Sequence, residues 1–141
     1  MSELPPRLNE IVEDFAILEG REKLEYLLEF AESMPDLPDW LQGKQGEMDQ
    51  VHECITPIFL FAEKKEDNTF TFHFDIPRES PTVRGYANIL QQGLNGSTLE
   101  QVLEIPNEFY LGMGIQSVIT GQRLNGISAI LAHMKQQDQI S

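Results

Sequence analysis

The feature that most constrains the fold is a short run in which phenylalanine alternates with polar residues. Phe70, Phe72 and Phe74 occupy every second position between 69 and 75. Successive side chains of a β-strand point to opposite faces, so this run predicts a strand with one aromatic face. A second apolar run at 58–64 precedes it, and the polar turn residues between them predict a hairpin. A hairpin is marginal alone, so its aromatic face must be covered by helices.

The rest of the chain carries apolar residues at helical spacing. The predicted helices cover residues 6–18, 22–34, 81–94 and 121–136. Ser80-Pro81 predicts an N-cap followed by proline in the first turn, and Ser97 with Glu100 has the spacing of a capping box.

A third strand over 51–54 is weakly indicated, and residues 35–50 are expected to form a loop. The pattern predicts an α+β fold in which helices flank a small antiparallel sheet. We expect one domain over residues 1–141, a length that suits a single core.

Charge and composition narrow the possible partners and location. The chain carries 23 acidic against 10 basic residues, for a formal net charge of −13. Phosphate backbones and anionic membrane surfaces would be repelled, so we expect neither nucleic acid nor membrane as a partner. An acidic surface does favour a basic protein partner. The sequence has no apolar run long enough to span a bilayer and no signal-peptide pattern at its start. With a single cysteine, we expect a reducing, cytoplasmic protein.

Cys54 is the one intrinsically strong nucleophile. A lone cysteine is often only a small buried apolar residue. Its position between a polar loop and the hairpin favours presentation of the thiol instead. In a strand, His52 would share a face with Cys54 and help to hold a thiolate, whereas Glu53 would disfavour one. No second histidine lies at metal-ligand spacing, and we expect no metal. Composition alone leaves the function undecided.

Three blocks of sequence resemble the SufE family. Residues 51–59 (VHECITPIF) are similar to the cysteine segment of the family, which runs into its first strand. Residues 80–85 (SPTVRG) resemble the segment after the sheet, and residues 121–130 (GQRLNGISAI) resemble the closing helix. Their order and spacing agree, and the resemblance covers nearly the whole chain.

This resemblance implies a sandwich of the kind shared with IscU-type cluster scaffolds. It implies that Cys54 accepts persulfide sulfur from a cysteine desulfurase (SufS- or CsdA-like) and stimulates that enzyme. The receiver would be a SufB-containing scaffold complex for iron–sulfur cluster assembly. Pyridoxal phosphate would belong to the desulfurase, and no cofactor of this chain is implied. One departure is clear, because Glu53 stands where many members have glycine.

Supporting roles are expected for four residues around the cysteine segment. Arg123 falls on a recurrent arginine of the family and would hold a thiolate or dock the partner, with a surface ion pair as the alternative. His52 and Glu53 would shape the loop. Arg84 would dock the partner or, as the favoured alternative, pair with a surface carboxylate.

Other readings of the chain remain open. His133 is expected on the exposed face of the last helix, and Gly85 and Gly126 at close contacts between helices. A non-catalytic adaptor of the desulfurase and a stand-alone thiol enzyme are the rival functions. A cluster scaffold would need several cysteine ligands, which this chain lacks.

Overall fold

The computed structural model describes residues 4–54 and 56–140, apart from the side chains at 122, 123 and 138–140. The helices are α1 (Pro6–Ile17), α2 (Arg21–Glu32), α3 (Pro81–Leu94), α4 (Leu99–Leu103) and α5 (Gly121–Ile140). The strands are β1 (Asp49–Gln50), β2 (Phe59–Lys64), β3 (Thr69–Asp75) and β4 (Ser97–Thr98), and single 3₁₀ turns lie at Asp39–Leu41, Gln45–Glu47, Phe109–Met113 and Ile115–Ser117. The strands form one antiparallel sheet in the order β1-β2-β3-β4, so the predicted α+β fold is confirmed.

The hairpin of β2 and β3 has the aromatic face that the sequence predicted. Phe70, Phe72 and Phe74 are 3%, 1% and 3% exposed, and Leu60 pairs with Phe74 on the same face. The predicted strand at 51–54 is wrong, because β1 lies two residues earlier, at Asp49–Gln50. Residues 52–54 instead form a turn that leads the chain back to β2.

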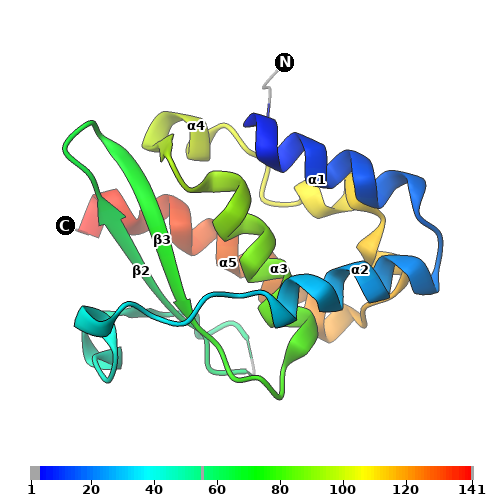
Figure 1. Cartoon of the computed structure of the whole chain (residues 1–141), viewed down its shortest axis with the longest axis horizontal. Helices are drawn as coiled ribbons and strands as arrows, with labels where there is room; N and C mark the ends of the chain where they lie inside the picture. Colours follow the sequence, from blue (N-terminus) through cyan, green and yellow to red (C-terminus); the bar gives the residue numbers. More distant parts are fainter. Residues whose placement is uncertain (1–3, 55, 141) are drawn as a thin grey trace.

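Helix α3 lies at the centre of the molecule, between the hairpin and the paired helices α1 and α2 (Figure 1). Its buried Arg84 donates to the carbonyl oxygens of Ala31 (3.1 Å) and Ile76 (2.6 Å), and Asn88 donates to Phe30 O (2.7 Å). The last carbonyls of a helix have no partner within it, so α3 supplies donors to the last turn of α2. The expected pairing of Arg84 with a surface carboxylate is therefore wrong: this side chain is 9% exposed and bonded to main chain.

Helix α5 begins at Gly121, as predicted, but its C-terminal end and the caps of α3 and α4 differ from the prediction. The capping box is formed by Thr98 and Gln101, not by Ser97 and Glu100, because Ser97 pairs with Phe70 in the sheet. Helix α5 runs to Ile140 rather than ending at 136. Ser80 makes no side-chain cap on α3.

Gly85 permits the close crossing of α2 and α3, as predicted. A methyl group at this position would overlap the carbonyl oxygen of Leu27.

We expect Gly85→Ala to lower the free energy of unfolding by about 1–3 kcal/mol in urea titrations, despite the higher helix propensity of alanine. Gly46→Ala is the matched control, since nothing lies within 4 Å of its added methyl. Equal stability of the two variants would contradict this account of the crossing.

Candidate functional site

The cysteine lies on a short loop whose base is closed by the sheet. The Val51 amide donates to the carbonyl of Ile58 (2.9 Å), and both side chains are fully buried. Cys54 lies between these two anchors and is half-buried. Further along, the hydroxyls of Thr56 and Ser80 are 2.9 Å apart, which ties the end of the loop to the start of α3. The loop is thus held at its base and at its exit, with the thiol between them.

The side chain of Cys54 rests against a glycine of α5. An ideal Cβ at Gly126 would lie 2.6 Å from Cys54 Sγ and 2.9 Å from its Cβ. Real Cβ atoms essentially never approach so closely, so only glycine leaves room for the cysteine here. The close contact predicted for Gly126 therefore exists, but it is with the cysteine loop and not with another helix.

An imidazole of α5 ties the same loop to the sheet edge. His133 Nδ1 lies 2.7 Å from Asp49 Oδ2, and His133 Nε2 lies 2.9 Å from Glu53 Oε1. Gln137 also donates to Asp49 (3.0 Å). The expectation that His133 is exposed is wrong: its side chain is 13% exposed, since it sits between β1 and the loop.

His133 and Glu53 shift each other's pKa values. Burial lowers the pKa of His133, but the hydrogen bonds to Asp49 and Glu53 outweigh it and raise that pKa above its usual 6.5. The hydrogen bond from His133 lowers the pKa of Glu53 below 4.5. The His133 contribution to stability is therefore complete below pH 6.5 and is lost as pH rises through its raised pKa. The Glu53 contribution is present above pH 4.5 and is lost as pH falls through its lowered pKa.

Among the predicted site residues whose side chains the structure describes, Cys54 and Glu53 are the ones that take part in this arrangement. His52 is exposed in a turn and therefore does not share a strand face with Cys54. Arg84 donates its hydrogen bonds to the carbonyls of Ala31 and Ile76, which lie outside the cysteine loop. The side chain of Arg123 lies outside the described residues.

Asp49 and His133 were not among the residues predicted for the site. A usable signal was present, because Gly126 and His133 are seven residues apart and so lie on the same face of a helix. No pattern in the sequence indicates that this face meets the cysteine loop rather than solvent.

The described residues form neither a metal site nor a membrane-spanning helix. In residues 4–54 and 56–140 no group of three or more histidine, cysteine or acidic side chains could hold a metal ion. The helices of that part of the chain are also too short or too polar to cross a membrane.

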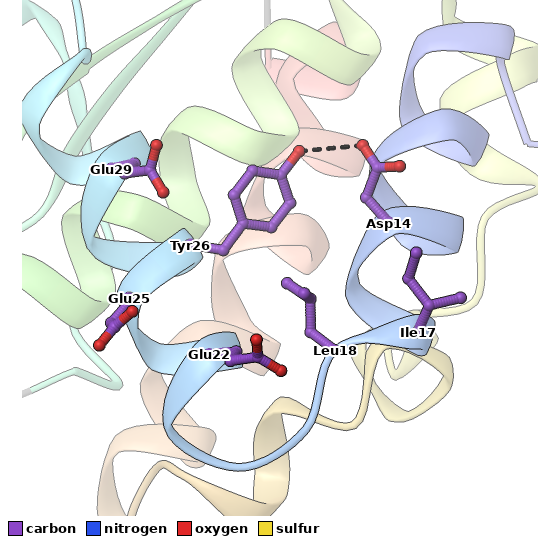
Figure 2. Close-up of a pocket in the computed structure, with 7 residues that line it drawn as sticks. All are labelled: Asp14, Ile17, Leu18, Glu22, Glu25, Tyr26 and Glu29. Atoms are coloured by element: carbon purple, nitrogen blue, oxygen red, sulfur yellow. Dashed lines mark hydrogen bonds between the residues drawn. The ribbon is translucent and has the colours of Figure 1, made fainter.

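Apart from the cysteine loop, a groove lies between α1 and α2. This groove has a volume of about 440 Å³. The Tyr26 hydroxyl donates to Asp14 (3.1 Å), and Figure 2 shows this bond spanning the groove from α2 to α1. Burial and the hydrogen bond to Asp14 raise the pKa of Tyr26. Glu22, Glu25 and Glu29 line one wall. The polar side chains that line the groove are carboxylates and one tyrosine, and no described residue in its lining carries a thiol or imidazole, so Cys54 remains the candidate centre for sulfur chemistry.

Comparison with known proteins decides the family. Residues 9–138 match the family model described as SufE, Fe-S metabolism associated domain. The chain belongs to the SufE family. It is 41% identical to uncharacterized SufE-like proteins of two Mycobacterium tuberculosis strains, over 95% of this chain and 92% of each relative. A role in iron–sulfur metabolism follows from this SufE membership.

Two further comparisons concern a more distant relative and a solved structure. The chain is 26% identical to SufE-like protein 1, chloroplastic/mitochondrial, of Arabidopsis thaliana, over 97% of this chain and 36% of that longer protein. A solution structure of a hypothetical protein from Thermus thermophilus superposes with a TM-score of 0.83 at 36% identity, covering 98% of this chain and 97% of the other. The sandwich expected for the SufE family is thus confirmed.

The contact between Gly126 and Cys54 can be tested by thiol reactivity. We expect Gly126→Ala to displace the Cys54 side chain from α5 and to accelerate its alkylation by iodoacetamide several-fold, because the new methyl fills the space of the sulfur. Gly121→Ala, at the start of the same helix and with nothing within 4 Å, is the control. An unchanged alkylation rate in a folded Gly126→Ala protein would show that Sγ does not rest there.

Proposed function

We propose that this protein accepts sulfur from a cysteine desulfurase onto Cys54, stimulates that enzyme, and delivers the sulfur to iron–sulfur cluster assembly. The observation that carries the proposal is the placement of the only cysteine of a SufE-family chain, half-buried on a loop anchored at both ends. A desulfurase of the SufS or CsdA kind would be the donor, and a SufB-containing scaffold complex the receiver.

The chemical step is an exchange between a thiolate and a persulfide. Cys54 loses its proton to solvent, and its Sγ attacks the outer sulfur of the desulfurase persulfide. A new S–S bond forms on Cys54 as the old one breaks, and the desulfurase cysteine leaves as a thiolate. One S–S bond replaces another, so no external oxidant or reductant is needed. With no second cysteine in the chain, no internal disulfide can discharge the sulfur.

The surroundings of Cys54 support a carrier rather than a stand-alone thiol enzyme. A thiol hydrolase needs a base aimed at its sulfur. His133 has both ring nitrogens within hydrogen-bond distance of carboxylates, and His52 is exposed in the turn. Activation of the sulfur would instead come from the persulfide of the partner.

The charge of the chain supports a protein partner with a basic docking surface. The net charge of −13 would speed encounter with such a surface and would make the association sensitive to salt. Arg123 and Arg84, two of the few cations, are proposed to assist docking, Arg84 indirectly through its hold on α2 and on Ile76, the residue after β3.

Substitution of the cysteine separates an acceptor from an adaptor. We expect wild-type protein to raise the turnover of its desulfurase and Cys54→Ser to lose that stimulation, because without a thiol the persulfide cannot be cleared. The measurement is alanine release from cysteine at saturating partner, with co-purification to verify that the variant still binds. Full stimulation by Cys54→Ser would favour the adaptor.

A further inference from the structure

We propose that His133 is a positioning residue, whose protonated imidazolium clamps the Cys54 loop against α5 and releases it on losing the proton. The contacts that form this clamp do not depend on the function of the protein. Its role in the reaction rests on the proposed sulfur transfer. It consists of His133 on α5, Asp49 on β1 and Glu53 in the loop.

The geometry requires both ring nitrogens of His133 to be donors. Asp49 lies 2.7 Å from Nδ1, and Glu53 lies 2.9 and 3.2 Å from Nε2. Ionised carboxylates accept hydrogen bonds and cannot donate them, and a neutral imidazole has only one N–H. Both contacts can form together only with the imidazolium. The neutral ring would keep one carboxylate and face the other with a lone pair.

Release of Glu53 would act directly on the reacting thiol. Glu53 precedes Cys54 in the chain, and its side chain is 56% exposed. The hydrogen bond from His133 is the largest influence on the pKa of this carboxylate, ahead of the bond from the Glu53 amide. Cys54 rests on Gly126, seven residues before His133 and on the same face of α5. The same face of α5 therefore contacts both the sulfur of Cys54 and the carboxylate of Glu53. Release of the Glu53 carboxylate would make it easier for the adjacent Cys54 to leave the helix.

Other polar and charged groups near the clamp do not take over the pH-dependent bond that His133 makes to Glu53. Gln137 on α5 donates to Asp49 whatever the pH, and Glu47 lines the neighbouring groove with them. On β2, Glu63 is bonded to His73 and Lys65, and Lys64 is exposed. His52 is next to Glu53 and exposed in the turn, and it lowers the pKa of Glu53 less than His133 does.

The clamp would set how often Cys54 is available to the desulfurase. Attack on a persulfide held by another protein requires the sulfur to leave Gly126, so the rate depends on the population of released loop. With His133 protonated, the docked loop is favoured. Above its raised pKa, Asp49 and Glu53 lose their shared cation and repel each other, and release is favoured.

The test is the rate of Cys54 alkylation in His133→Gln relative to wild type, at about pH 6 and about pH 9. We expect the variant to react about three- to tenfold faster at the lower pH and within about 1.5-fold of wild type at the higher pH. Loss of a nearby cation by itself disfavours the thiolate, so acceleration reports release of the loop. His73→Gln is the matched control, since His73 also bonds a glutamate (3.0 Å) at similar exposure but on the outer sheet face.

A second measurement needs no variant. Amide hydrogen exchange of residues 51–58 in wild type, corrected for intrinsic rates, should show lower protection at about pH 9 than at about pH 6. Equal alkylation of His133→Gln and wild type at both pH values, or a loop equally protected at both, overturns the clamp. Sulfur transfer from the desulfurase, measured on the same samples, separates the two claims: its absence with a working clamp overturns only the proposed function.

Discussion

The burial of the β3 phenylalanines against α3 is the interaction from which the remaining arrangement follows. A two-stranded hairpin cannot bury this face by itself, so a helix has to lie across it. Helix α3 does so while carrying polar side chains into the core, where hydrogen bonds from their nitrogen atoms to main-chain carbonyls offset part of the cost of burial. Gln91 donates to Phe72 O (2.8 Å), and Asn88 and Arg84 donate to the end of α2. These directional bonds fix α2 and β3 relative to the one central helix.

The cysteine loop takes its position from this frame without entering the core. Its base continues the pairing of β1 with β2 through Val51 and Ile58, whose side chains are buried. Its tip meets α5, which packs on both α3 and β2. The base is held by main-chain pairing and buried side chains, whereas the tip is held by a few polar contacts, so release of the tip would not require the sheet to unfold. A sulfur acceptor needs this combination, because its thiol has to be sheltered at rest and still reach a partner.

The parts of the fold predictable from sequence are those set by local periodicity. The alternation of Phe70, Phe72 and Phe74 fixes which face of the hairpin is buried, and the position of Cys54 beside it follows from chain order. The clamp was not predictable, since the contact of His133 with Asp49 and Glu53 joins residues about eighty positions apart. Arg84 was misassigned for a similar reason. A cation at a helix position normally seeks solvent, and only the approach of α2 supplies the buried carbonyls that hold it.

The central claim is that Cys54 itself carries the sulfur. The most direct measurement is intact-protein mass spectrometry after incubation with the desulfurase, cysteine and pyridoxal phosphate, followed by peptide mapping without reductant. The account predicts the added mass of one or more sulfur atoms on the peptide containing Cys54, and none on the Cys54→Ser protein. An unmodified Cys54, under conditions in which the desulfurase turns over and binds this protein, would contradict it.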